Sequence, residues 1–221
     1  MGLLSHLSNP GVAIIFAVAL FFALTVHEFF HAFVAHLCGD DTAKAMGRMT
    51  MNPLAHLSLA GTLVMLFLPF GWAKPVPIVP RNFRNPKIDS LLVSGAGISA
   101  NILTAFSFGI LARFIGWENM NYGAMELVFY FMLINLGFAF FNLLPIPPLD
   151  GSKILAFFLP SSIAHKIEYM GPVAQIVCIG VIYAIFYLIP LASQILSAII
   201  NYFFYAFSGG DLLVINKIVG G

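Results

Sequence analysis

Uncharged apolar runs of membrane-span length alternate with short polar segments along the chain. Four runs are of this size: Gly11–Leu37, whose only charged residue is Glu28, then Ser90–Ala112, Leu127–Leu149 and Tyr169–Gly210. About 20 apolar residues cross the hydrocarbon core of a bilayer, so the last run is long enough to cross twice. The pattern predicts an all-α polytopic membrane protein with about five transmembrane helices.

Two further segments differ from ordinary spans. The apolar run Leu54–Phe70 is at the lower length limit for a span and contains Gly61 and Pro69. The following segment, Gly71–Lys87, carries four prolines. Because proline lacks the backbone N–H that a helix needs, we expect a short strand-like loop there.

The distribution of Lys and Arg predicts the topology, since short basic loops stay on the cytoplasmic side. Eight of the ten basic residues lie in three segments: after the first run, in the proline-rich loop and after the third run. These segments share one side only if Leu54–Phe70 enters the membrane and returns, so we expect a re-entrant element. With five spans and this re-entrant element, the C-terminal tail is expected on the cytoplasmic side.

Composition excludes other classes of protein. The chain is 60% hydrophobic and 9% charged, against about half and about a quarter in soluble domains. Its mean hydropathy is +0.96. The net charge of +1 comes with no basic stripe, so no nucleic-acid partner is expected, and two cysteines make no disulfide framework. We expect residues 1–221 to form a single membrane-embedded domain in contact with the lipid bilayer.

Three ionisable residues interrupt the first apolar run in the pattern H-E-x-x-H. His27 and His31 are four positions apart and share a helix face, where two imidazoles can bind one zinc ion. Glu28 is close enough to take a proton from zinc-bound water, whose pKa zinc lowers toward about 7. An ionisable group at mid-bilayer costs of order 3 kcal/mol, which a bound cation would offset. The alternative is a packing cluster of neutral histidines with a protonated Glu28.

A catalytic zinc needs a third protein ligand, and Asp150 is the best candidate among the few acids. It follows three prolines in NLLPIPPLDG, which break a helix, and irregular backbone at membrane depth usually lines a cavity. The predicted topology brings Asp150 to the side of the histidines. The alternative is a helix-ending Asp-Gly turn. We expect Asp40 and Asp41 in a surface loop and His36 at the membrane interface.

Four motifs together resemble one known family. They are HEFFH, NLLPIPPLDG, GAGISAN, and GRMTMNPLAHLSLAGTL followed by GWAKPVPI, and the resemblance covers roughly Thr25 to Gly151. The sequence is similar to the site-2 protease family of intramembrane zinc metalloproteases, in the compact bacterial and archaeal branch that lacks appended domains.

The resemblance implies a role for each matching residue. His27, His31 and Asp150 would bind one Zn²⁺ per chain, and Glu28 would be the general base and then the general acid. Asn142 would hydrogen-bond the substrate backbone or the developing oxyanion. Asn101 is a second candidate for that work.

The resemblance also implies a function. The chain would be a hydrolase that cleaves a peptide bond in or near a transmembrane segment of a membrane protein, with zinc-bound water as the nucleophile, in regulated intramembrane proteolysis. The loop around Lys74–Pro77 would receive substrate as an added strand. We expect a multi-pass protein of a prokaryotic cell membrane, with its active site toward the cytoplasmic half and with regulation by a membrane partner. A non-proteolytic zinc-binding scaffold or adaptor and a metal transporter are the alternatives.

Overall fold

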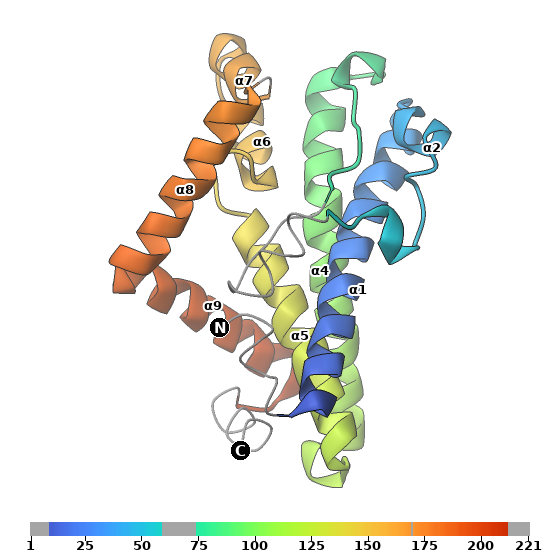
Figure 1. Ribbon diagram of the computed structural model, residues 1–221, viewed down its shortest axis with the longest axis vertical. Helices are drawn as coiled ribbons and strands as arrows, with labels where there is room; N and C mark the ends of the chain where they lie inside the picture. Colours follow the sequence, from blue (N-terminus) through green and yellow to red (C-terminus); the bar gives the residue numbers. More distant parts are fainter. Residues whose placement is uncertain (1–8, 59–73, 169, 212–221) are drawn as a thin grey trace.

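The computed structural model describes residues 9–58, 74–168 and 170–211 (Figure 1). All regular secondary structure within these ranges is helical. The long helices are α1 (Pro10–Leu37), α4 (Pro86–Ile115), α5 (Tyr122–Asn142), α8 (Pro172–Leu188) and α9 (Pro190–Ser208). The short ones are α2 (Thr42–Ala45), η2 (Pro53–Ala55), η3 (Pro80–Asn82), η4 (Trp117–Asn119), α6 (Asp150–Phe157) and α7 (Ser161–Glu168).

Three Asn-Pro pairs fix where helices begin. In each pair the Asn side chain accepts a hydrogen bond from a backbone N–H of the first turn. The proline takes the first helical position, where its missing N–H costs nothing. The pairs are Asn9-Pro10 at α1, Asn52-Pro53 at η2 and Asn85-Pro86 at α4.

Within the described residues, four helices are long and apolar enough to cross a membrane: α1, α4, α5 and α9. The shorter α8 is also apolar and has 17 residues. The prediction of an all-α polytopic membrane protein is therefore confirmed. The predicted re-entrant element lies mostly outside the described residues, because the structure describes only 54–58 of Leu54–Phe70. The proline-rich segment is described from residue 74 and contains η3 but no strand within that part.

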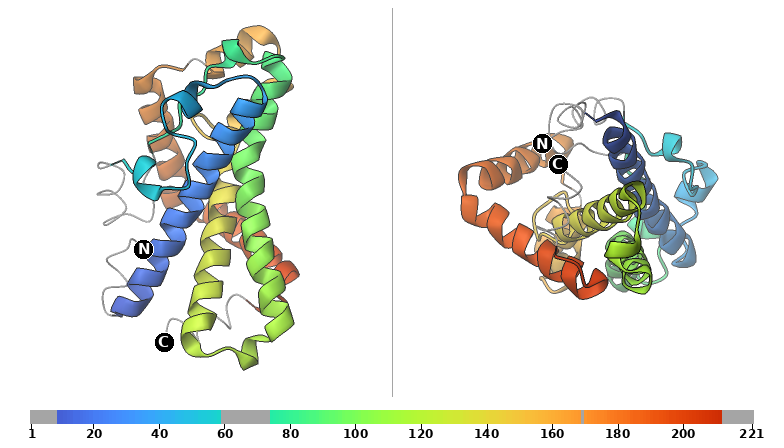
Figure 2. Two further views of the ribbon diagram at one scale, coloured as in Figure 1. Left: turned by 90° about the vertical axis from the view of Figure 1, so that its right-hand side faces the viewer. Right: turned by 90° about the horizontal axis from the view of Figure 1, so that it is seen from below.

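The core is formed by α1, α4 and α5, which pack side by side (Figure 2). Its largest fully buried side chains include Phe129, Met132 and Leu136 of α5 and Phe204 of α9. The middle helix α5 thus contributes most to the core. The end of α9 packs closely against α4 of the core. At Gly109 of α4, an added Cβ would lie 2.6 Å from Phe207 of α9.

Helices α8 and α9 form an arm beside the core. In Figure 1, α8 runs down from the α7 end of the molecule and α9 continues to the opposite end of α4 and α5. The last turn of α9 is fixed there, because Arg113 donates to Phe207 O and Trp117 donates to Ser208 O. The last turn of α9 therefore lies at the end of the core away from the basic loops. The predicted cytoplasmic C-terminal tail lies outside the described residues from residue 212 onward. Helix α9 starts at Pro190, directly after α8. It runs toward the far ends of α4 and α5 and does not return toward the start of α8 (Figure 1).

One end of the core carries the polar segments that surround the site. The chain leaves α5 at Asn142 and re-enters helix at Asp150, and α6 packs against α4. Lys87 of α4 lies over the Phe157 ring, with 5.1 Å between the ammonium and the ring centroid. The loops after α1 and before α4 lie at this same end (Figure 1).

Candidate metal centre

The H-E-x-x-H residues lie on the buried face of α1. His27 and His31 are each 5% exposed and Glu28 is 9% exposed. The helical spacing brings the two imidazoles together edge to face, with 4.5 Å between their ring centroids. Their Nε2 atoms are 3.0 Å apart, so both rings present the same atom to one point.

Asp150 completes the group from the other side of the cavity. Its Oδ2 lies 3.0 Å from Nε2 of His27 and 3.0 Å from Nε2 of His31, and its Oδ1 lies 3.9 Å from the ammonium of Lys153. The turn that delivers Asp150 is tight, because a Cβ at Gly151 would approach Leu143 O to 2.1 Å. The glycine of the Asp-Gly pair is thus required by the close approach of the chain to the end of α5.

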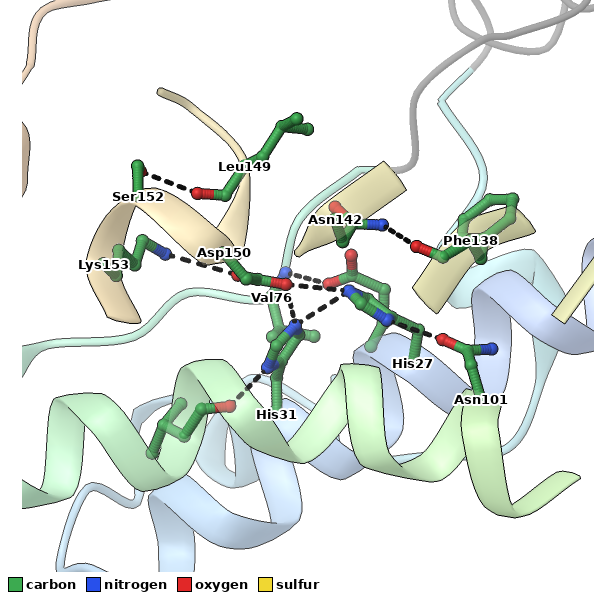
Figure 3. A network of polar contacts seen from close by, with 12 residues as sticks. His27, His31, Val76, Asn101, Phe138, Asn142, Leu149, Asp150, Ser152 and Lys153 are labelled. Atoms are coloured by element: carbon green, nitrogen blue, oxygen red, sulfur yellow. Dashed lines mark hydrogen bonds and ion pairs between the residues drawn. The ribbon is translucent and has the colours of Figure 1, made fainter. Parts of the chain in front are cut away.

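The tautomer of each histidine follows from its other contact (Figure 3). Nδ1 of His31 lies 2.7 Å from the backbone oxygen of Val93, which only accepts, so Nδ1–H is the donor. Nδ1 of His27 lies 2.7 Å from Oδ1 of Asn101. The Asn101 amide nitrogen donates to Ala23 O and to Oδ1 of Asn135, which leaves its oxygen to accept from His27. In neutral rings both Nε2 atoms therefore carry lone pairs.

The convergence of these atoms fits a bound cation. With both rings neutral, two unprotonated nitrogens and a carboxylate oxygen meet at 3.0 Å, where they repel one another unless a positive charge lies between them. Ligands about 2.0–2.1 Å from a tetrahedral zinc are about 3.3 Å apart, close to the observed spacing. The set of two imidazoles and one carboxylate also leaves one coordination position for water or substrate. The three residues could hold a zinc ion.

A glycine of α4 allows the two helices to approach at this point. A Cβ at Gly97 would lie 2.7 Å from ring atoms of both His27 and His31. At Gly95, two positions earlier, no atom lies within 4 Å of such a Cβ. The histidine rings therefore fit only because Gly97 has no side chain, whereas Gly95 has no neighbour that a side chain would displace.

Glu28 faces the same cavity but has a different support. The cavity of about 150 Å³ is lined by residues of α1, α4, α5, α6 and the proline-rich segment, among them His27, Glu28, His31, Val76, Asn142 and Asp150. The N–H of Val76 donates to Oε2 of Glu28 across 2.8 Å. The carboxylate is therefore next to the candidate metal ligands and is held by a loop rather than by a helix.

The two predicted asparagines are in different environments. Asn142 is half-buried and lines the cavity, and its amide nitrogen donates to Phe138 O. Asn101 is fully buried and its amide is committed to His27, Ala23 and Asn135. The structure places Asn101 behind His27, and Asn101 does not line the cavity. Of the two asparagines, Asn142 is the one that lines it.

Sequence reasoning missed two contributors to the site. Asn135 is fully buried in α5 and connects Asn101 to the backbone oxygen of Phe131. A polar side chain within a 23-residue uncharged run was the available signal. No sequence signal indicated that the Val76 N–H would bond Glu28, because the two residues are 48 positions apart.

The acidic loop after α1 also differs from its prediction. Asp40 is 1% exposed and not on the surface. It accepts hydrogen bonds from the Thr42 hydroxyl, the Val79 N–H and the Asn82 amide. Burial alone would raise the pKa of the Asp40 carboxyl, but these hydrogen bonds hold the pKa below its usual range. The acid ties the end of α1 to the proline-rich segment, whereas its neighbour Asp41 is exposed as predicted.

Comparison with known proteins identifies the family. The profile of "Peptidase family M50" matches residues 109–186. The chain is 36% identical over 190 residues to "Putative zinc metalloprotease YwhC" of Bacillus subtilis (strain 168), covering 83% of this chain and 84% of that protein. The chain belongs to peptidase family M50, the site-2 protease family.

More distant M50 relatives match over a smaller share of their length. "Putative zinc metalloprotease Rip2" of Mycolicibacterium smegmatis is 31% identical over 155 residues, which are 66% of this chain and 57% of that protein. Rip2 of Mycobacterium tuberculosis is 28% identical over 153 residues, 67% of this chain and 59% of that protein. No solved structure gives a significant match. The M50 match extends into α8, past Gly151, where the resemblance of the motifs ends.

Proposed function

We propose that this M50 member is an intramembrane zinc metalloprotease. It would hydrolyse a peptide bond in or near a transmembrane segment of a membrane protein. One observation carries the proposal: three lone-pair atoms of His27, His31 and Asp150 converge at 3.0 Å beside the Glu28 carboxylate. The relatives named as zinc metalloproteases support the choice of metal and of reaction.

The proposed chemistry divides the work between the ion and Glu28. A zinc ion held by His27, His31 and Asp150 would act as a Lewis acid toward a carbonyl oxygen and would lower the pKa of water toward about 7. Glu28 would accept the proton from the attacking water. It would then give that proton to the amine that leaves. The base requires a fixed carboxylate in the cavity, and the Val76 N–H supplies a hydrogen bond that orients it.

The substrate must present an unpaired carbonyl to this cavity. A peptide carbonyl within a helix is already hydrogen-bonded, so the substrate helix would unwind locally before cleavage. The half-buried Asn142 would then hydrogen-bond the exposed substrate backbone, since its side chain lines the cavity. The exposed apolar side chains of the long helices provide the surface that lipid and a transmembrane substrate would share.

The proposed orientation follows from charge. The segment before α4, the start of α4 and α6 lie at the end of the core that carries the site (Figure 1). These segments contain the basic residues Lys74, Arg81, Arg84, Lys87 and Lys153. By the positive-inside rule this end is cytoplasmic, so the site would be in the cytoplasmic half of a prokaryotic cell membrane. We further propose that residues 1–221 act as one membrane-embedded domain and that a membrane partner controls access.

The test compares the wild type with Glu28→Gln in native membranes. Glu28→Gln should keep one zinc per chain, lose cleavage by at least about 10³-fold and accumulate bound, uncleaved transmembrane proteins. Mass spectrometry of the captured proteins and of new chain ends measures both effects, and zinc is measured on the same samples. Identical cleavage products from the two chains would refute the proteolytic function. Zinc flux into proteoliposomes by both chains would instead indicate a transporter.

A further inference from the structure

The proline-rich segment forms a strap over the candidate base. We define the strap as residues 74–79, which run without regular secondary structure from the end of the undescribed range to η3. Within Pro75-Val76-Pro77 only Val76 has a backbone N–H, and this N–H donates to Oε2 of Glu28. The Val76 side chain is 6% exposed and packs with Ala32 and Ala43. The strap therefore offers Glu28 one donor, at a position fixed by packing.

The near end of the strap is held by two residues of the segment that follows α2. The Arg48 guanidinium donates through Nη2 to Lys74 O across 2.6 Å and to Pro75 O across 3.3 Å. The Lys74 N–H donates to His56 O across 2.8 Å. The His56 ring is itself fully buried and donates to Thr50 O. Arg48 and His56 thus bracket the first residue of the strap.

The far end of the strap is fixed by the buried acid of the α1–α2 loop. Asp40 accepts the Val79 N–H through Oδ2 across 2.7 Å and the Asn82 amide through Oδ1 across 2.9 Å. The strap is therefore held on both sides of Val76. Of these contacts, those of Arg48 come nearest to Val76 along the chain, because they reach the carbonyl of Pro75, whose peptide bond also contains the Val76 N–H.

Arg48 is an unusual anchor because it is charged and buried. Its exposed fraction is 8%. Among the residues that the structure describes, no carboxylate lies within ion-pair distance of the guanidinium. A buried charge is costly unless it is hydrogen-bonded, and Arg48 donates to the backbone oxygens of Lys74 and Pro75. The burial of this charge is thus coupled to the position of the 74–75 backbone.

We propose that Arg48 is a positioning residue for Glu28, acting through the backbone of Lys74 and Pro75 on the Val76 N–H. The inference rests on the proposed function, because it assigns Glu28 the role of base. A glutamate side chain has several rotatable bonds, and a fixed donor selects the rotamer that faces the cavity. Arg48 does not contact the metal ligands in any described interaction, so its loss should affect the base and not the metal.

The test uses the zinc-loaded full chain and three variants. The substrate is the transmembrane protein captured by the Glu28→Gln chain, reconstituted with the protease in phosphatidylcholine vesicles. Arg48→Ala should lower kcat by about 10- to 100-fold, since misplacement by about 1 Å can cost about 10²-fold, with KM within about twofold and one zinc per chain. Arg48→Lys should recover part of kcat, because an ammonium can still reach one carbonyl oxygen. Arg81→Ala removes an exposed charge from the same loop and should change nothing.

Amide hydrogen exchange tests the strap without any substrate. The Val76 amide should exchange slowly in the wild type and at least about 10-fold faster in Arg48→Ala and in Glu28→Ala, because each variant removes one side of the contact. Wild-type kcat and slow Val76 exchange in Arg48→Ala would overturn the inference, as would a loss of zinc that matches the loss of kcat. If Arg48→Ala does not fold, Arg48→Lys decides between these outcomes. Absence of cleavage by the wild type would refute the proposed function, while the exchange rates would still decide the role of Arg48.

Discussion

His27 and Glu28 are neighbours on α1, yet different parts of the molecule hold them. His27 is fixed by helices: Asn101 of α4 accepts its Nδ1–H, and Asn135 of α5 binds Asn101. Glu28 is fixed by the strap, through the N–H of Val76. A helix backbone is held by its own hydrogen bonds, whereas the strap depends on the side chains of Arg48 and Asp40.

In the proposed function, metal binding and proton transfer would therefore have separate supports. Substitutions behind His27 should lower zinc affinity, and substitutions along the strap should lower turnover with zinc still bound. The separation would also suit the proposed protease, because the candidate metal ligands lie on packed helices while the strap lines the cavity that would admit a peptide. Variants on the two sides should thus be distinguishable by zinc content alone.

The largest effect on zinc affinity is expected at Gly97. An added Cβ would lie 2.7 Å from the rings of both histidines, so the rings or the helices must move. Gly97→Ala should lower zinc affinity by about 100-fold or more, at the upper end of the range for substitutions behind metal ligands. Gly95→Ala is the matched control, because its Cβ would meet no atom within 4 Å. Competition with a zinc chelator measures both affinities, and equal values for the two variants would contradict the packing role of Gly97.

A smaller loss of zinc affinity is expected when Asn101 can no longer accept from His27. Asn101→Leu keeps the approximate size of the side chain but removes the acceptor of the Nδ1–H. Loss of such an outer contact typically costs about 10- to 100-fold in metal affinity. Zinc titration against the chelator should show this loss, and zinc-saturated Asn101→Leu should recover most of its turnover. Unchanged zinc affinity in Asn101→Leu would show that Asn101 does not support the metal centre.

The smallest effect is expected at Asp40 and depends on pH. The pKa of Asp40 in the folded chain is below its usual range, so its stabilising contribution is complete above about pH 4 and is lost as the pH falls through the lowered pKa. At pH 6, Asp40→Asn should be less stable by about 1–3 kcal/mol, the usual value of charge-assisted hydrogen bonds. Below about pH 3 the difference between the two chains should shrink, because Asp40 is then increasingly protonated.

Thermal unfolding in detergent at both pH values measures this difference. Asp41→Asn is the control, because Asp41 is the exposed neighbour of Asp40. A stability difference that does not shrink in acid would show that the carboxylate charge of Asp40 is unimportant. A difference of equal size in Asp41→Asn would point to the charge of the loop as a whole.

The sequence was sufficient to predict which three side chains the structure brings together in the candidate metal centre. Spacing placed His27 and His31 on one helix face, and a broken helix next to an acid singled out Asp150. The structure brings these three together, with Oδ2 of Asp150 3.0 Å from each Nε2. Local patterns predicted this grouping because each of the three residues lies in a segment whose own sequence carries the signal.

Sequence reasoning failed where a contact joins distant segments. Asp40 was expected on the surface because it lies in a short polar loop, but its donors Val79 and Asn82 lie 39 and 42 positions later. The direction of α9 was also missed, because hydropathy predicts the length of a helix and not its path. The contact of Trp117 with Ser208, 91 positions away, fixes that path.

The most direct test of the metal centre is zinc K-edge X-ray absorption on the purified, zinc-loaded chain. We predict one zinc per chain with two imidazole ligands at about 2.0–2.1 Å, the remaining ligands being oxygen. Asp150→Ala should remove zinc or replace the lost carboxylate by another oxygen ligand, with the two imidazoles retained where zinc stays bound. Sulfur scattering at about 2.3 Å, or a zinc bound by a single imidazole, would contradict a centre formed by His27, His31 and Asp150.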